Sequence, residues 1–158
     1  MHPEAVFSDL LIEEVSALAN FTEHLAVAAG ETIFEEGSTD DALYISLTGR
    51  LTASARLPNG NAVQFGEIVA GEIFGEIAFL DGMPRSATVI AHSDCELLRL
   101  PRWCFEDLQT LYPGVAGKIT RDLARILAAR LRRSDNHLVS AVQGSTHNHA
   151  VGAPVASS

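Results

Sequence analysis

The chain has 158 residues, of which 47% are hydrophobic and 20% charged, so it is long enough for one soluble domain with a core of its own. Its net charge is −9, with 14 acidic and 3 basic residues in residues 1–93 and 6 acidic and 8 basic in residues 94–158. An acidic chain repels nucleic acid as a whole, and no apolar run approaches the roughly 20 residues that span a bilayer, so DNA binding and membrane insertion are both disfavoured.

The first predicted element is an amphipathic helix over residues 8–19. Leu11, Val15 and Leu18 share one face of this helix, and Ser8 or Asp9 is a suitable N-cap. Residues 1–15 lack the basic start of a signal peptide, and acidic residues interrupt any apolar stretch there: Glu4, Asp9, Glu13 and Glu14. We therefore expect a cytoplasmic protein that begins its fold with a helix.

Residues 25–100 have a different texture, in which short apolar runs are separated by glycines at fairly even spacing. This pattern indicates many short strands joined by turns. Residues 42–47 and 51–57 are expected to pair around Thr48-Gly49, and residues 87–91 to pair with 96–100. Pro58-Asn59-Gly60-Asn61 is a strong hairpin signal, because Asn and Gly tolerate positive φ.

After Pro101 the pattern becomes helical again. Residues 102–111 predict a short helix, and Pro113 suits the first turn of a long helix that ends near residue 142. The remaining residues, 143–158, are small and polar and are predicted to be a disordered tail. The two cysteines, Cys95 and Cys104, are interpreted as buried thiols of a protein in a reducing compartment.

The predicted fold class is therefore α+β: an antiparallel β-roll, resembling a jelly-roll barrel, flanked by an N-terminal helix and two C-terminal helices. The domain is placed at residues 1–142, with the roll at about 22–101 and the C-terminal helices at about 102–142.

Residues 71–89 carry the chemistry. A short helix beginning just after Gly75 presents free backbone N–H groups and a positive dipole end, which suit an anion. Arg85 follows the rigid Pro84, and its planar fork matches two oxygens of one phosphate. Glu76 repels a phosphate but can accept a hydrogen bond from a sugar hydroxyl, so the set suits a ribose phosphate. The alternative is a surface ion pair between Glu76 and Arg85, worth only ~0–1 kcal/mol.

The stretch from Phe74-Gly75-Glu76 to Arg85-Ser86-Ala87 resembles the phosphate-binding cassette of cyclic nucleotide-binding domains, as found in bacterial catabolite activators, kinase regulatory subunits and nucleotide-gated channels. The resemblance covers about residues 10–138. It implies that Arg85 binds the phosphate and that Glu76 accepts the ribose 2′-hydroxyl. The remaining cassette residues implied to line the ligand are Phe74, Gly75, Ile77, Ala78, Ser86 and Ala87.

The resemblance also implies a wall and a lid for the base. Ala53, Val63 and Phe65 form the expected strand wall, although a plain core role fits them nearly as well. Arg130, Arg133 and Ser134 lie on the long helix, where activator-type members place base or phosphate contacts. Phe79 and Leu80 packing against Phe105 and Leu108 are the expected relay to that helix.

The same helix repeats Leu127, Leu131, Ser134, Leu138 and Ala141 at coiled-coil spacing, which indicates a homodimer or a stripe that covers the chain's own roll.

The function expected from all this is a non-enzymatic sensor of cyclic AMP, or of cyclic GMP, that switches its C-terminal helices. No catalytic residues, metal or other cofactor are expected. A second reading is the excised regulatory domain of a larger bacterial transporter, channel or enzyme with an unknown effector, because too few residues follow the long helix for a DNA-binding domain. A cupin-like metal enzyme is disfavoured because the six histidines form no spaced set on neighbouring strands.

Overall fold

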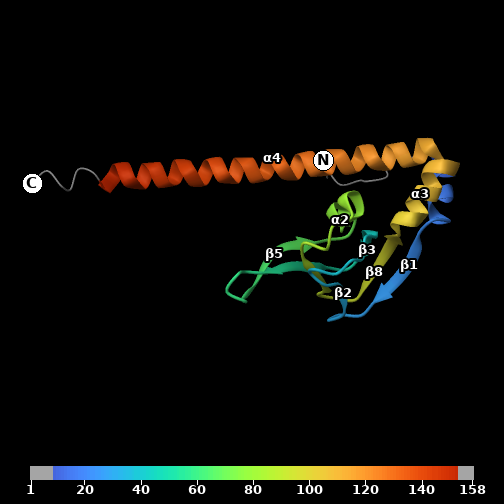
Figure 1. The fold of residues 1–158 in the computed structure, drawn as a ribbon, viewed down its shortest axis with the longest axis horizontal. Coiled ribbons are helices and arrows are strands. Elements are labelled where there is room, and N and C mark those ends of the chain that lie inside the picture. Colours follow the sequence, from blue (N-terminus) through green and yellow to red (C-terminus); the bar gives the residue numbers. More distant parts are fainter. Residues whose placement is uncertain (1–8, 153–158) are drawn as a thin grey trace, which may run out of the picture. The chain divides into compact units, whose positions relative to one another are not determined.

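The computed structural model describes residues 9–152, with side chains described as far as Asn136 (Figure 1). Helix α1 precedes eight strands, the short helix α2 is inserted between β6 and β7, and helices α3 and α4 follow β8. The helices are α1 (Ile12–Ala19), α2 (Glu76–Asp81), α3 (Arg102–Leu111) and α4 (Pro113–Gly152). The strands are β1 (Glu23–Val27), β2 (Thr32–Phe34), β3 (Leu43–Thr48), β4 (Leu51–Arg56), β5 (Ala62–Ile68), β6 (Ile73–Phe74), β7 (Thr88–Ala91) and β8 (Cys95–Leu100).

The strands form two four-stranded antiparallel sheets, ordered β1-β8-β3-β6 and β2-β7-β4-β5. No hydrogen-bonded strand pair of the described residues joins one sheet to the other, so the roll is not a closed barrel. The predicted α+β class, with a β-roll between an N-terminal helix and two C-terminal helices, is confirmed.

Two predicted strand pairs are wrong. Strands β3 and β4 lie in different sheets, and so do β7 and β8. The physical reason for the first lies at Gly49, which has a φ of 90° and crosses from one sheet to the other. A Cβ at Gly49 would lie 2.4 Å from the carbonyl oxygen of Asp94 and 2.6 Å from Sγ of Cys95. The backbone at Gly49 therefore packs directly against the turn between β7 and β8, with no room for a side chain. The predicted hairpin around Gly60 is confirmed, because β4 pairs with β5.

The interior of the roll opens at one end. Along the inner face of the second sheet, Leu51 is fully buried and Ala53, opposite Val89, is nearly so. Further along the same face Ala55 is half-buried, and its partner Val63 is 41% exposed. The open end is therefore the end at which residues 85–87 enter β7.

Helix α1 begins later than predicted. It starts at Ile12 with Leu11 as the N-cap, so Asp9 does not cap it, and Ser8 lies outside the described residues. Of the three residues expected on its buried face, Leu18 is buried, whereas Leu11 and Val15 are exposed. The helix is only two turns long, and its buried residues, Ala17 and Leu18, both lie in its last turn.

Helix α3 has its predicted bounds, and α4 begins at Pro113 as expected. The chain divides into two compact units, residues 1–123 and 124–158, so the first turns of α4 belong to the unit that contains the roll. Within that unit α4 buries Val115, Ala116, Ile119 and Leu123. No helix of the described residues is both long and apolar enough to cross a bilayer.

Two smaller expectations also need correction. Helix α4 continues to Gly152, so residues 143–152 are helical where a disordered tail was predicted, and residues 153–158 lie outside the described residues. Helical periodicity of small and polar residues is weak, which is why the sequence placed the end too early. Cys95 is buried as expected, but Cys104 is only half-buried.

Candidate functional site

Arg85 is the centre of the site, and its guanidinium group is fixed from several sides. Its Nη1 donates to the carbonyl oxygen of Gly75 at 2.8 Å. Its Nη2 donates to Oδ2 of Asp40 at 2.9 Å and to the carbonyl oxygen of Ala42 at 2.6 Å. The guanidinium carbon lies 4.0 Å from the centre of the Phe34 ring, within cation–π range. Arg85 is only 3% exposed, so its side chain is held in place before any ligand arrives.

The backbone of Arg85 is fixed as well. Its N–H donates to the carbonyl oxygen of Ser38 at 2.8 Å, and its own carbonyl accepts from the N–H of Gly37 at 2.8 Å. The loop between β2 and β3 therefore holds the backbone of Arg85 in place through these two hydrogen bonds. Pro84, which has a fixed φ, precedes the arginine and restricts it further.

One nitrogen of this guanidinium group donates no hydrogen bond within the part of the chain that the structure describes. Among the described residues, Nε of Arg85 is buried and has no hydrogen-bond partner. An arginine carries five N–H donors, of which three are engaged by Gly75, Asp40 and Ala42. A buried donor without an acceptor costs about 1–3 kcal/mol, so such groups are rare and call for an explanation.

Helix α2 follows directly from the turn at Gly75. Gly75 has a φ of 77°, a left-handed conformation that side chains disfavour, and its carbonyl oxygen faces Arg85. Glu76, the first residue of α2, is only 4% exposed and is therefore buried rather than at the surface. The first backbone N–H groups of α2 have no intrahelical acceptor, as at any helix start. The predicted short helix after Gly75 is confirmed.

The other cassette residues divide between core and surface. Phe74 stacks on Tyr44 at a centroid distance of 5.2 Å, and Ala78 is buried. The side chains of Phe74 and Ala78 therefore belong to the core that supports the cassette. Ile77 and Ser86 are exposed, and Ala87 is half-buried beside the open end of the roll. The structure therefore leaves Ile77, Ser86 and Ala87 accessible to a ligand.

Asp40 is the site residue that the sequence did not reveal. Besides its ion pair with Arg85, it accepts from the Tyr44 hydroxyl at 2.9 Å and lies 3.3 Å from Nη2 of Arg99. Burial by itself raises the pKa of the Asp40 carboxyl, but the hydrogen bonds from Arg85, the Ala42 amide and the Tyr44 hydroxyl outweigh this effect and hold the pKa below its ordinary value. Asp40 is therefore a carboxylate that orients the clamp.

Replacing Asp40 with asparagine should lower the free energy of unfolding by about 1–2 kcal/mol at neutral pH, because the buried Arg85 charge loses its counter-ion. The folded pKa is depressed, so this contribution is complete above the ordinary Asp pKa of about 4 and is lost as the pH falls through the folded value. Urea unfolding at pH 7 and pH 3.5 should show the gap between the variant and the wild type shrinking. Asp41→Asn, in the same loop, controls for the loss of one negative charge, and a pH-independent gap would contradict the assignment.

The predicted strand wall lies on the inner face of the second sheet. Ala53 is buried opposite Val89, and Val63 pairs with Ala55. The pairing shifts between Ala53 and Ser54, which leaves Phe65 as an extra residue in β5. A bulge of this kind re-aims side chains, and Phe65 is 61% exposed. Ala55 was not predicted as part of this wall, although its alternation with Ala53 along the strand gave the signal.

The predicted lid residues belong to the other unit. Arg130 is half-buried, and Arg133 and Ser134 are exposed, all on α4 beyond Ala124. Their contacts with a base stay a prediction. The predicted relay is partly visible within the roll unit: the ring of Phe79 meets that of Phe105 edge-on at 5.1 Å and Leu108 is fully buried, whereas Leu80 is largely exposed.

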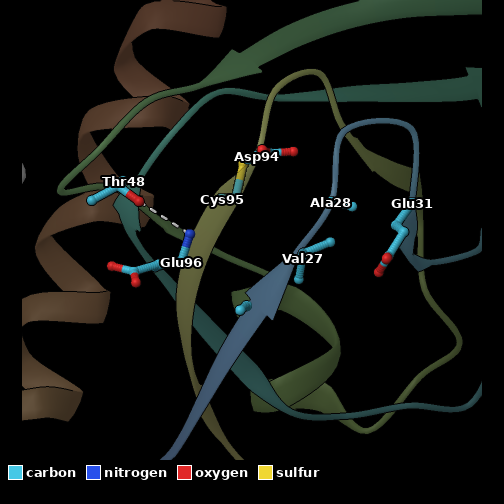
Figure 2. A pocket seen from close by; sticks show the side chains of 8 residues that line it. Val27, Ala28, Glu31, Thr48, Asp94, Cys95 and Glu96 are labelled. Atoms are coloured by element: carbon cyan, nitrogen blue, oxygen red, sulfur yellow. Dashed lines mark hydrogen bonds between the residues drawn. The ribbon is translucent and has the colours of Figure 1, made fainter.

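A separate pocket of about 540 Å³ lies at the ends of β1 and β3 and the turn before β8 (Figure 2). Its lining includes three acidic residues, Glu31, Asp94 and Glu96. The Asp94 carboxylate accepts a hydrogen bond from the Ala29 amide, and the Thr48 hydroxyl accepts one from the Glu96 amide, as drawn in Figure 2. None of the predicted site residues lines it. Within the part of the chain that the structure describes, no group of three or more His, Cys, Asp or Glu residues is arranged to hold a metal ion.

Comparison with known proteins gives consistent matches. The profile of the family described as cyclic nucleotide-binding domain matches residues 24–111. Lysophospholipase nte1 of Aspergillus niger is 36% identical over 110 residues, which are 70% of this chain but 7% of that protein. The catabolite activator protein of Thermus thermophilus superposes with a TM-score of 0.77 at 30% identity, over 87% of this chain and 63% of that one.

A further neighbour is the regulatory subunit of a cAMP-independent protein kinase A from Trypanosoma brucei. Its TM-score is 0.67 at 26% identity, over 78% of this chain and 43% of that one.

Proposed function

Because the chain belongs to the cyclic nucleotide-binding domain family, we propose that it is a non-enzymatic sensor that binds a 3′,5′-cyclic mononucleotide at the cassette formed by residues 74–87. The observation that carries the proposal is the buried Arg85 side chain, fixed by three hydrogen bonds and yet without a partner for its Nε. A phosphate oxygen at Nε makes a charge-assisted hydrogen bond that needs no further ordering of the side chain.

The sugar and the base are assigned to the residues around this clamp. Glu76, buried at the first turn of α2, accepts the ribose 2′-hydroxyl, while Ser86 and Ala87 give further donors to the phosphate. The base lies against the inner face of β4 and β5, between Val63 and Phe65. We favour cyclic AMP over cyclic GMP, because Ser86 serves the phosphate and no other group on this wall is assigned to a guanine amine.

Isothermal titration calorimetry with cyclic AMP, cyclic GMP and 2′-deoxy cyclic AMP tests these assignments. We expect cyclic AMP to bind with about −8 kcal/mol or better, which is micromolar affinity. The 2′-deoxy analogue should bind more weakly than cyclic AMP to the wild type, and as well as cyclic AMP to Glu76→Ala, which has no side-chain acceptor for the 2′-hydroxyl. Absence of heat with either cyclic nucleotide, confirmed by an unchanged melting temperature, would overturn the proposed function.

The response to the ligand is a shift between two arrangements of the helices that follow the roll. The Phe79–Phe105 ring contact connects the cassette helix α2 to α3, which leads directly into α4. A ligand that binds one arrangement more tightly shifts the population towards it. Spin labels on α2 and α4 should therefore report a ligand-dependent distance.

The chain spans 7% of the length of the Aspergillus niger relative. We therefore also propose that it is a module that regulates a larger protein, and that this protein lies in the cytoplasm.

We propose further that α4 forms a parallel homodimer. The stripe of Leu127, Leu131 and Ser134 has coiled-coil spacing, and Leu131 is exposed. With Leu131 at position a, Arg130 falls at position g and Asp135 at the following position e, which oppose each other between parallel helices.

Reversing one charge of this pair tests the dimer. Asp135→Arg should raise the dimer dissociation constant about tenfold, because two attractive contacts become repulsive. Sedimentation velocity across a concentration series measures this constant. Asp135→Asn is the milder control, and a monomer at all concentrations in the wild type would contradict the dimer.

A further inference from the structure

The start of helix α1 is tied to the start of helix α4 by one carboxylate. Oε1 of Glu14 accepts a hydrogen bond from the backbone N–H of Leu11 at 2.9 Å and from Nζ of Lys118 at 2.6 Å. The same Nζ donates to the carbonyl oxygen of Asp9 at 3.0 Å. Lys118 of α4 therefore contacts both the backbone of Asp9, in the segment before α1, and the Glu14 side chain that caps α1.

Helix α1 depends on this contact at its N-terminus. The N-cap residue Leu11 has no side-chain acceptor, so Glu14 is the group that reaches back to cap the helix. A helix of eight residues is marginal by itself, and α1 buries only Ala17 and Leu18, both in its last turn. Its first turn is thus fixed mainly through Glu14.

Lys118, in contrast, is on a well-packed segment. Its neighbours Val115, Ala116 and Ile119 are all buried in the unit that contains the roll. The position of the Lys118 ammonium group therefore follows the position of the first turns of α4. A shift of α4 by a fraction of a turn moves this group away from Glu14, because the two are joined by a single 2.6 Å contact.

We propose that Lys118 and Glu14 form a latch through which the position of α4 decides whether the first turn of α1 is folded. When the latch is closed, α1 displays Leu11, Ile12 and Val15 as an exposed apolar ridge, with Ile12 84% exposed. When it opens, the first turn frays and the ridge is lost. A ligand that moves α4 then changes the N-terminal surface of the domain; this second step rests on the proposed function.

Hydrogen exchange of the full chain, followed residue by residue by NMR, tests the latch without ligand. The amide of Val15, which donates to the carbonyl oxygen of Leu11 at 2.9 Å, reports on the first turn of α1. In the Lys118→Met variant the Val15 amide should exchange about fivefold faster than in the wild type, while the amides of strands β3 and β8 stay protected. Lys118→Arg, which keeps a cation, should restore protection. Arg121→Met, an exposed cation one turn further along α4, is the control and should change nothing.

The double variant Glu14→Gln/Lys118→Met separates a direct contact from two independent effects. A glutamine still accepts from the Leu11 amide but no longer pairs with a cation, so the double variant should exchange no faster than the faster single variant. Additive rates, or an unchanged Val15 amide in Lys118→Met, would overturn the latch.

Addition of cyclic AMP tests the second step. The exchange of the Val15 amide should change by about threefold or more in the wild type and stay constant in Lys118→Met. If calorimetry shows binding but the wild-type exchange is unchanged, the ligand does not act through the latch. If calorimetry shows no binding, the proposed function fails while the ligand-free result still decides the latch.

Discussion

Arg85→Ala is expected to weaken cyclic AMP binding about 30- to 1000-fold, which is a loss of ~2–4 kcal/mol. The ligand phosphate carries a full negative charge, and Arg85 is the buried cation that we propose binds it through Nε, which has no hydrogen-bond partner among the described residues. Removing the side chain leaves a desolvated phosphate without its charge-assisted partner. Calorimetry at constant salt measures the difference directly.

The same substitution also removes the counter-ion of Asp40, so stability and binding have to be measured separately. Arg85→Lys keeps a positive charge but not the planar group that reaches Gly75, Asp40 and Ala42 together. It should fold with a melting temperature closer to that of the wild type and still bind cyclic AMP at least about tenfold more weakly.

Arg99→Ala is the matched control for the electrostatic network. Nη2 of Arg99 lies 3.3 Å from Oδ1 of Asp40, whereas Arg85 pairs with Oδ2, and Nη1 of Arg99 lies 3.2 Å from Oε2 of Glu23. Its loss should disturb Asp40 and leave the clamp of Arg85 in place, with affinity within about threefold of the wild type. The clamp is refuted if Arg85→Ala and Arg99→Ala weaken binding equally.

Most of the local structure followed from the sequence because its signals are short in range. Gly75 before Glu76 predicts a turn into a helix, and Pro113 predicts the first turn of α4; the structure has both. Each signal depends on the φ preference of one residue and on its immediate neighbours. The order of elements, and with it the place of the cassette between β6 and β7, could therefore be predicted.

The strand partners could not be predicted in the same way. The apolar residues of β3 and β4 fit a hairpin as well as two strands in different sheets, because either arrangement can bury them. The decision comes from the corner at Gly49, where the chain packs against Asp94 and Cys95, more than 40 residues away. Neighbouring strands are the common pairing, and here tertiary packing prevails over it.

Asp40 was missed for the same reason. It lies 45 residues before Arg85 in the chain, next to Asp41 and in an acidic loop where it has the appearance of a solvated charge. Its role depends on burial beside Arg85 and on the hydroxyl of Tyr44, and neither has a signature in one sequence. Sequence reasoning thus found the arginine that we propose contacts the ligand but not the carboxylate that orients this arginine.

Gly75→Ala is expected to weaken cyclic AMP binding at least about tenfold beyond what backbone strain alone explains. Gly75 has a φ of 77°, so any Cβ is strained there. A Cβ at this position would also lie 2.6 Å from Nη1 of Arg85 and 3.2 Å from the carbonyl oxygen of Ala42. Arginine side chains move easily when exposed, but this one is buried and held by three hydrogen bonds, so the added methyl group has to push the guanidinium away from its position.

Gly30→Ala isolates the strain from the displacement. Gly30 has a φ of 89°, and a Cβ there would meet no atom within 4 Å, so its substitution carries the backbone strain of about 1–2 kcal/mol and nothing else. Both variants should lose stability in urea unfolding, and only Gly75→Ala should lose affinity in calorimetry. Equal affinities for the two variants would mean that the ligand does not use Arg85 in the position that Gly75 and Asp40 give it. A loss of affinity in Gly75→Ala alone would instead show that the absence of a side chain at Gly75 keeps the Arg85 guanidinium in its position for the phosphate.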